Sequence, residues 1–336
     1  MNKESLSESI LEIRDLTVHY EVGQEVIKAV NHLNLSLKKG RTLGLVGETG
    51  AGKTTTALAI QKLIMSPPGV IKSGTVDICG NKIMELPVKD LELIRGSVVS
   101  MIFQDPMTSL NPVFTVGEQI AESYMIHEGI PKKQAIEKAM KMLETVGIPR
   151  NRASEFPHQF SGGMRQRVVI AIALTCNPQL LIADEPTTAL DVTIQAQILD
   201  LMRKLKEGRG MSMIMITHAL GIVADICDEV AVMYAGRIVE KGSLADIFNH
   251  TKHPYTEGLF NSLPNIRNRS MRLIPIPGLM PDPAHLPAGC AFAPRCKYAG
   301  SDCTAEQPEE HWISDSHMVA CAAYGRNGFH IERHEK

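Results

Sequence analysis

The sequence lacks several features that mark whole classes of protein. With a formal net charge of -2 and a pI near 6.6, the chain has no basic surplus of the kind typical of nucleic-acid binding. Residues 1–10 contain no apolar core of a signal peptide. The longest uncharged stretch, 168–183, is interrupted by polar residues and proline and is too short to span a bilayer. We therefore expect a cytoplasmic protein with no nucleic-acid partner, whose work at a membrane depends on partner chains.

The chain does contain enough apolar residues for a large packed core. It has 336 residues, of which 44% are hydrophobic, so we expect one large domain followed by an extension. Short apolar strands alternate with helical stretches, which predicts a mainly parallel sheet covered on both faces. Residues 11–20 and 26–37 predict two antiparallel strands, and 105–165 a helical insert. A proline-rich stretch at 264–287 predicts a connecting segment without regular structure.

One stretch has the pattern of a phosphate-binding loop. It fits G-x-x-x-x-G-K-[ST], follows a short uncharged strand at 42–46 and precedes a helical run. Its glycines let successive N–H groups point at an anion, which the positive end of the following helix also attracts. Lys53 is placed to reach the β- and γ-phosphates, and the Thr54 hydroxyl to bind Mg²⁺. A Gly-rich turn is the alternative, which the complete motif disfavours. The loop residues are Gly47, Glu48, Thr49, Gly50, Ala51, Gly52, Lys53, Thr54 and Thr55.

Two further stretches contain groups suited to nucleotide chemistry. Asp184 and Glu185 end an apolar strand, where Asp184 is placed to hold Mg²⁺ and Glu185 to polarise the water that attacks the γ-phosphate. Ser161, Gly162 and Gly163 open a helix and predict a second phosphate-binding helix start, without a second lysine. One nucleotide needs only one such cradle, so the second makes sense if it faces a nucleotide held by another subunit. A simple Gly-rich N-cap is the alternative.

Taken in order, these motifs resemble those of the ATP-binding subunits of ABC transporters. The resemblance spans roughly residues 10–250 and adds Gln104, His218 and Ala189-Leu190-Asp191 to the stretches above. It implies an ATP-driven dimer in which the Walker A loop of one chain and the signature of the other, 161–166, enclose each ATP.

The resemblance also implies a role for single residues. Gln104 would sense Mg²⁺ and the attacking water, His218 would contact the γ-phosphate, and Tyr20 would stack on adenine. For Tyr20 the alternative is an edge-strand tyrosine that packs on the sheet. Gln166 in the signature and Asp191 in the D-loop complete the predicted nucleotide-binding residues.

Several stretches are similar to the oligopeptide and dipeptide importer branch of this family. They are Phe103 to Pro112, the Met-Arg-Gln-Arg of the signature, His253 to Thr256, Pro275 to Gly278, and Gly289 to Cys296. The resemblance implies an α/β fold with a RecA-like core, an antiparallel β subdomain and a helical subdomain at about 105–165. These parts would form an ATP-binding domain over residues 1–250, followed by a cysteine-containing extension over 251–336.

The same resemblance implies partners and an activity. We expect a peripheral ATPase on the cytoplasmic face of the inner membrane that powers uptake of di- and oligopeptides. Its partners would be two permeases, a second ATP-binding subunit and an extracytoplasmic substrate-binding protein. Import of another solute, such as nickel, haem, a sugar or glutathione, stays open, as does a soluble ABC ATPase not tied to transport.

Four of the seven cysteines crowd the last part of the chain. Cys290, Cys296, Cys303 and Cys321 have the spacing C-x5-C-x6-C-x17-C, and no C-x2-C pair occurs. Four thiolates can hold Zn²⁺ or an iron–sulfur cluster, and small buried apolar residues are the alternative. Because some members of the branch carry a cluster in this extension, the resemblance favours [4Fe-4S]. We expect such a cluster to hold the proline-rich tail together.

Overall fold

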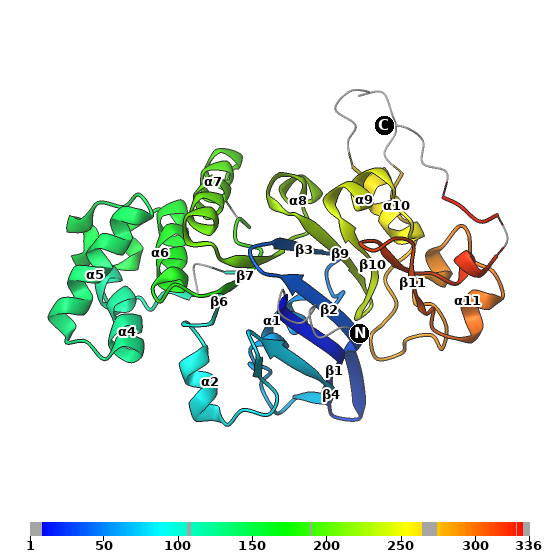
Figure 1. Cartoon of the computed structure of the whole chain (residues 1–336), viewed down its shortest axis with the longest axis horizontal. Helices are drawn as coiled ribbons and strands as arrows, with labels where there is room; N and C mark the ends of the chain where they lie inside the picture. Colours follow the sequence, from blue (N-terminus) through cyan, green and yellow to red (C-terminus); the bar gives the residue numbers. More distant parts are fainter. Residues whose placement is uncertain (1–8, 106–108, 189, 264–273, 327, 332–336) are drawn as a thin grey trace.

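The computed structural model describes residues 9–105, 109–188, 190–263, 274–326 and 328–331. Its centre is an eight-stranded sheet in the order β11-β12-β10-β9-β3-β8-β7-β6 (Figure 1). The strands from β9 to β6 pair in parallel, whereas β9, β10, β12 and β11 pair antiparallel. The strands are β3 (Thr42–Val46), β6 (Val99–Ile102), β7 (Leu180–Asp184), β8 (Ser212–Ile216), β9 (Glu229–Tyr234), β10 (Arg237–Ser243), β11 (Glu310–Trp312) and β12 (Met318–Ala320).

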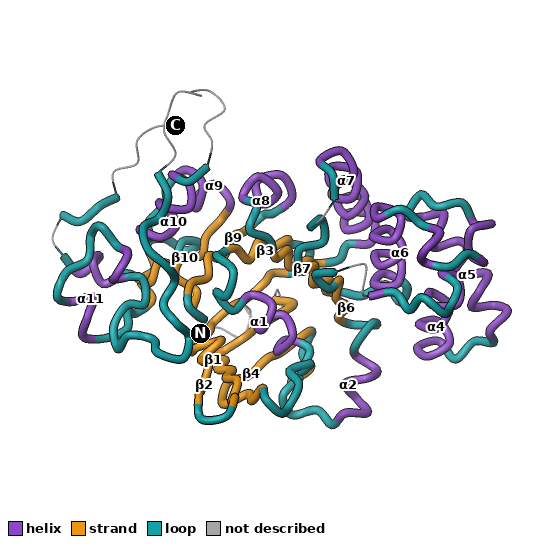
Figure 2. The backbone as a smooth tube through the Cα atoms, turned by 180° about the vertical axis from the view of Figure 1, so that it is seen from behind, coloured by secondary structure: helices purple, strands orange, loops and turns teal. Residues whose placement is uncertain are grey.

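Alternate residues of the central strands face two separate cores, which explains why these mainly apolar strands are buried along their whole length. In β8, Met213 and Met215 belong to one core, and Ile214 and Ile216 to the other. Figure 1 and Figure 2 show helices on one side of the sheet, and a helix with a second sheet on the other. The covering helices are α7 (Val192–Arg209) and α8 (Leu220–Ile226) on the first side and α1 (Lys53–Ile60) on the second.

The second sheet is antiparallel, in the order β2-β1-β4-β5. Its two longest strands pair along almost their whole length, with shifts in register near Leu16 and Val18. The two predicted antiparallel strands are therefore confirmed, and each is longer than its apolar pattern indicated. The strands are β1 (Ser9–Val22), β2 (Glu25–Lys38), β4 (Gly69–Ile78) and β5 (Asn81–Lys82).

The helical insert lies beyond β6, at the opposite end of the molecule from the C-terminal extension (Figure 1). Its first long helix begins with a capping box, in which Thr115 and Glu118 each accept a hydrogen bond from the other's backbone N–H. Pro131 is the N-cap residue of the next helix, and Gly147 (φ 78°) follows its C-cap residue, Val146. The helices in and around the insert are α2 (Val88–Ile94), α4 (Val116–Glu128), α5 (Lys132–Thr145) and α6 (Gly162–Leu174), with 3₁₀ turns at Arg150–Ser154 and Pro157–Gln159.

The C-terminal extension joins the main sheet. Strand β12 pairs with β10 through Val319 and Met318, and β11 adds the edge strand. The buried Glu240 carboxylate lies 2.8 Å from His317 Nε2 across this junction. Residues 274–292 contain neither helix nor strand, as the prolines predicted. The remaining elements are α9 (Leu244–Asn249), α10 (Pro254–Asn261), α11 (Asp302–Ala305) and the 3₁₀ turns Ala293–Arg295 and Ala322–Gly325.

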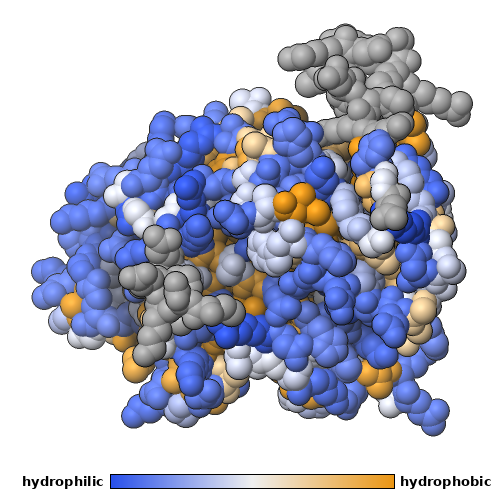
Figure 3. Space-filling view, turned by 45° about the vertical axis from the view of Figure 1, so that its right-hand side comes forward, coloured by the Kyte–Doolittle hydropathy of each residue, from blue (hydrophilic) through white to orange (hydrophobic). Residues whose placement is uncertain are grey.

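The surface is mainly polar on the face seen in Figure 3, where apolar side chains are exposed in small separate groups. Among the described helices, none combines the length and the apolar character needed to cross a membrane.

Candidate functional site

The predicted phosphate-binding loop lies between β3 and the start of α1 and packs closely against β2 and β9. A β-carbon at Gly47 would lie 2.2 Å from the Met233 carbonyl oxygen, and one at Gly52 would lie 2.3 Å from the Ala29 carbonyl oxygen. Gly52 also has a left-handed backbone (φ 101°) as it caps the helix. Only glycine fits both positions, so the glycines of the motif set the path of the loop.

Lys53 is buried at the first position of α1, and its Nζ points back into the loop. It donates hydrogen bonds to the carbonyls of Gly47 at 2.7 Å and Glu48 at 2.9 Å. Burial lowers the pKa of Lys53, while the carboxylates of Glu185, Asp184 and Glu48 act in the opposite direction. The ammonium group is therefore held at the loop, next to the acidic end of β7.

Asp184 ends β7 and is only 1% exposed. Among the described residues, neither of its carboxylate oxygens has a hydrogen-bond partner. Burial raises the pKa of Asp184, opposed by the Thr54 hydroxyl and by Lys53. Two orphaned oxygens in a buried site beside a threonine hydroxyl form an oxygen-donor set that suits Mg²⁺. The residues present therefore fit the predicted metal.

Glu185, the next residue, brings three predicted catalytic residues together. Gln104 Nε2 donates to its Oε2 at 3.3 Å, and His218 Nδ1 lies 3.2 Å from its Oε1. Thr188 Oγ1 also donates to Oε2, at 2.9 Å. Burial acts to raise the pKa of Glu185, but the hydrogen bonds from Thr188 and His218 outweigh it and leave the pKa lowered. Sequence reasoning did not include Thr188, although it lies three residues after Glu185.

Glu185 also has an unusual backbone. Its φ of 46° places a residue with a side chain in the left-handed region. Such a conformation costs about 1 to 3 kcal/mol and is typical of functional sites. Here it turns the chain at the end of β7, so that Asp184 stays buried while Glu185 reaches Gln104 and His218.

Tyr20 lies near the end of β1, beside the phosphate-binding loop. Its hydroxyl is 3.3 Å from Thr55 Oγ1, in the first turn of α1. In the sheet it pairs with Ile27 of β2 and Gly69 of β4. Tyr20 as a whole is partly buried, and its stacking on adenine stays a prediction.

Comparison with known proteins bears on this arrangement. The ABC transporter family profile matches residues 30–188, and that of the oligopeptide/dipeptide transporter C-terminal region matches 239–303. The oligopeptide transport ATP-binding protein OppD of Bacillus subtilis is 50% identical over 313 residues, or 92% of this chain and 87% of that protein. The chain belongs to the ABC transporter family.

Other relatives agree with this assignment. OppD of Salmonella typhimurium, also an oligopeptide transport ATP-binding protein, is 48% identical over 314 residues, or 93% of each chain. A dimeric structure of the ATP-binding cassette MJ0796 bound to ADP and Pi has a TM-score of 0.63 and 28% identity, covering 70% of this chain and 98% of that one. The predicted α/β ABC fold is confirmed, and the chain is an ABC-type ATPase.

The signature of this ABC ATPase begins α6. Ser161 is the N-cap residue and accepts a hydrogen bond from the Met164 N–H at 3.4 Å. A β-carbon at Gly163 would lie 2.5 Å from Ile194 of α7, so glycine is required there for helix packing. Gln166 is fully buried, and its amide has no hydrogen-bond partner among the described residues. The structure thus places Gln166 in the interior, whereas Ser161 is exposed.

Asp191, predicted to lie in the D-loop, is the N-cap residue of α7. Its Oδ1 accepts a hydrogen bond from the Ile194 N–H at 2.9 Å. Of the rest of the predicted D-loop, Leu190 is described and Ala189 lies outside the described residues. In the stretch that follows Gln104, residues 106–108 also lie outside them. The structure therefore gives Asp191 a helix-capping contact within its own chain.

The prediction of an iron–sulfur cluster is wrong. All four cysteines line one cavity of about 10 Å³, barely the space of a single water. In the described parts of the chain, no group of three or more His, Cys, Asp or Glu side chains is arranged to hold a metal ion, which counts equally against Zn²⁺. Burial raises the pKa of Cys296 to about 11 and that of Cys321 to about 12, which favours neutral thiols. The buried cysteines act as small apolar residues, and strand pairing with β10 holds the tail.

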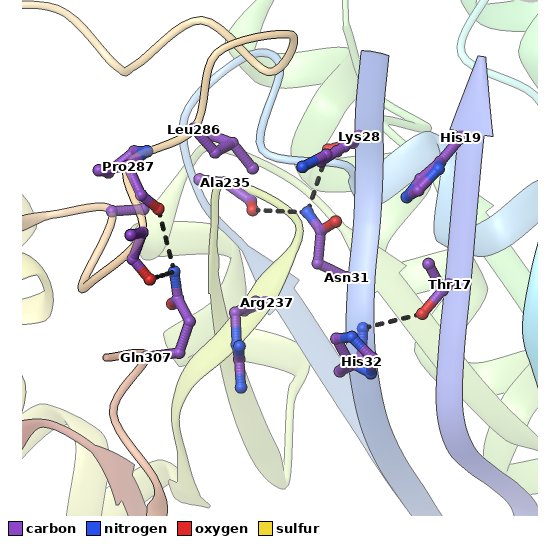
Figure 4. A pocket seen from close by; sticks show the side chains of 12 residues that line it. Thr17, His19, Lys28, Asn31, His32, Ala235, Arg237, Leu286, Pro287 and Gln307 are labelled. Atoms are coloured by element: carbon purple, nitrogen blue, oxygen red, sulfur yellow. Dashed lines mark hydrogen bonds between the residues drawn. The ribbon is translucent and has the colours of Figure 1, made fainter. Parts of the chain in front are cut away.

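A separate cavity of about 340 Å³ lies where the extension meets β1 and β2. Figure 4 shows Lys28, His19 and Asn31 on the strands, with Arg237 of β10 and Gln307 of the extension nearby. Asn31 is bonded to the carbonyls of Lys28 and Ala235. None of the predicted site residues lines this cavity.

Proposed function

We propose that this chain is the ATP-hydrolysing subunit of an importer of di- and oligopeptides. The observation that carries the proposal is the meeting of Gln104, His218 and Glu185 at the end of β7, beside the phosphate-binding loop. An ATP-binding domain over 1–250 performs hydrolysis, and the extension over 251–336 belongs to the peptide-transporter branch. The similarity to OppD proteins over most of the chain supports the peptide substrate.

The phosphate-binding loop and its neighbours divide the work on ATP. Backbone N–H groups of the phosphate-binding loop other than those of Glu48 and Ala51, which are bonded within the fold, bind the phosphates together with the Lys53 ammonium. Tyr20 stacks on the adenine. Thr54, Asp184 and Gln104 would hold Mg²⁺, which would supply positive charge to stabilise the phosphates.

Glu185 acts as the general base of the reaction. Its lowered pKa keeps the carboxylate ionised at neutral pH, so it can accept a proton from the water that attacks the γ-phosphate. His218 shares a hydrogen bond with Glu185 and is positioned to contact the γ-phosphate, and Gln104 orients the same carboxylate.

Assembly completes the site. Ser161, Gly162 and Gly163 lie at the start of α6 and bind a nucleotide held by a second ATP-binding subunit, in a head-to-tail pair. Gln166 of the signature and Asp191 of the D-loop complete the proposed nucleotide site; within this chain Gln166 is buried and Asp191 caps α7. Closure of the pair drives two permeases at the cytoplasmic face of the inner membrane, and an extracytoplasmic binding protein delivers the peptide.

Uptake by cells tests this proposal directly. A strain without the chain should fail to accumulate labelled di- and tripeptides, and the wild-type chain should restore uptake where Glu185→Gln does not. If Glu185→Gln restored uptake, Glu185 would not be required for the ATP hydrolysis that powers import. Normal peptide uptake in the deletion strain, with loss of nickel, haem, sugar or glutathione uptake, would identify a different solute.

A further inference from the structure

The C-terminal extension contacts the phosphate-binding loop at Glu48. The Glu48 N–H donates to the Tyr255 hydroxyl at 2.8 Å, and its carbonyl accepts from Lys53 at 2.9 Å. Its carboxylate accepts two hydrogen bonds from Arg295, at 2.9 and 3.1 Å. The backbone N–H, the carbonyl and the carboxylate of Glu48 are thus all bonded within the fold, and two of these three partner residues belong to the extension.

The Arg295 guanidinium is itself fixed in place. Its Nε donates to the Pro277 carbonyl at 2.9 Å, and Nη1 also donates to the Tyr234 hydroxyl at 3.2 Å. The side chain is 6% exposed, against 30% for that of Glu48. A guanidinium that is buried and makes a two-pronged contact with a carboxylate holds it in one orientation, unlike a mobile surface pair. Arg295 is therefore a rigid anchor for Glu48.

This contact matters for ATP because Glu48 belongs to the loop that receives the phosphates. An unpaired carboxylate there would repel the triphosphate, and a loop that moved freely would lose more entropy on binding. The Met280 side chain of the extension also lies beside the middle of the loop, where its Cε would be 2.9 Å from a β-carbon at Gly50. The bonds from Tyr255 and Arg295 therefore restrain the loop from the side of the extension.

We infer that Arg295 is a positioning residue for ATP: it neutralises Glu48 and holds the phosphate-binding loop in its binding conformation. The inference rests on the proposed ATPase function and extends the nucleotide site into the C-terminal extension. Arg295 acts through Glu48, because all three guanidinium nitrogens are bonded to protein groups. Its loss weakens ATP binding more than the chemical step, since Gln104 and His218 bond to Glu185 independently of it.

Replacement of Arg295 tests the inference in the full-length ATPase. Arg295→Gln should raise both the KM for ATP and the Kd of a fluorescent ATP analogue by roughly tenfold. The kcat at saturating ATP should stay within about twofold of the wild-type value, because the contacts of Glu185 are unchanged. Lys297→Gln is the matched control: it removes another basic residue of the extension, which pairs with Glu257 and not with the loop. Its KM should equal that of the wild type.

A double variant shows whether Arg295 acts through Glu48. In Glu48→Gln/Arg295→Gln the carboxylate is absent, so the added loss from Arg295→Gln should be small and the two effects non-additive. Arg295→Lys keeps the positive charge but cannot make the two-pronged contact, so its Kd for the ATP analogue should be intermediate. This variant also tests the inference if Arg295→Gln folds poorly. An unchanged KM and Kd, or a fully additive double variant, would overturn the inference. A wild-type chain that binds ATP without hydrolysing it would refute the proposed function, while the Kd comparison would still test Arg295.

Discussion

Among single residues, Glu185 links most of the features on which the proposed hydrolysis depends. It lies directly after the metal-binding candidate Asp184, its backbone is in the left-handed region, and Gln104, Thr188 and His218 all bond to its carboxylate. A residue held in this way is strained but well oriented, as expected for a general base.

His218 should affect the rate without affecting the fold. Its side chain is 66% exposed and its imidazole is bonded to Glu185. We expect His218→Ala to slow ATP hydrolysis at saturating ATP roughly 10²-fold, with the thermal unfolding midpoint unchanged. Steady-state hydrolysis and a thermal melt measure both. His250→Ala, on an exposed histidine outside the site, serves as control. Wild-type turnover in His218→Ala would exclude the residue from the reaction.

The sequence identified most of these side chains because their spacing reflects local geometry. The loop glycines and Lys53 follow β3, and Asp184 and Glu185 lie at the end of β7, so that in each case a short motif fixes the backbone path. Arg295 gave no such signal: its partner Glu48 is 247 positions away, and nothing in either local sequence specifies the pairing. The burial of Gln166 could not be predicted from the sequence either, because it depends on how α6 packs.

At the level of secondary structure, α10 contains a buried histidine that should make stability depend on pH. His253 is the N-cap residue, and its Nδ1 accepts a hydrogen bond from the Tyr255 N–H. Burial lowers the pKa of His253 to about 3. Its ordinary value is about 6.5, so below that pH the unfolded chain binds a proton that the folded chain does not. Stability contributed by neutral His253 is therefore lost as pH falls from about 6.5 toward 3.

We expect His253→Asn, which retains a capping acceptor, to reduce this pH dependence. The free energy of unfolding of the wild type should fall more steeply between pH 6.5 and 5, by up to about 1.4 kcal/mol per pH unit. Urea unfolding at several pH values measures the difference. Identical slopes for the two proteins would mean that His253 is protonated in the folded state.

Secondary structure followed from sequence where periodicity was long enough to be read. The strand at 42–46, the two antiparallel strands and the helices of the insert appeared where they were expected. The strands β11 and β12 have three residues each, too few for an alternating pattern, and their positions depend on pairing with β10. The pairing that holds the tail therefore could not be predicted, and the tail was instead expected to depend on a metal cluster at its four cysteines.

For the whole molecule, the junction between the extension and the main sheet depends on Glu240. This carboxylate is 0% exposed and accepts hydrogen bonds from the backbone N–H groups of Lys252 and His253, with His317 Nε2 at 2.8 Å. Removal of one hydrogen-bond partner of a buried carboxylate lowers the free energy of unfolding, because water cannot take the place of the lost partner.

His317→Ala should therefore destabilise the protein by about 2 kcal/mol. His285→Ala is the matched control, since its pair with Asp282 is exposed and should contribute almost nothing. Urea unfolding at neutral pH compares the two. If both variants are as stable as the wild type, the contact at Glu240 does not secure the extension.

The central claim is that this chain hydrolyses ATP with Glu185 as the base, and one measurement tests it most directly. Steady-state ATP hydrolysis should fall roughly 10²- to 10⁴-fold in Glu185→Gln, while ATP binding by the same protein is retained. Glu207→Gln, an exposed residue of α7, should hydrolyse ATP like the wild type. Near-normal turnover in Glu185→Gln would contradict the account, because the water would then be activated by another group.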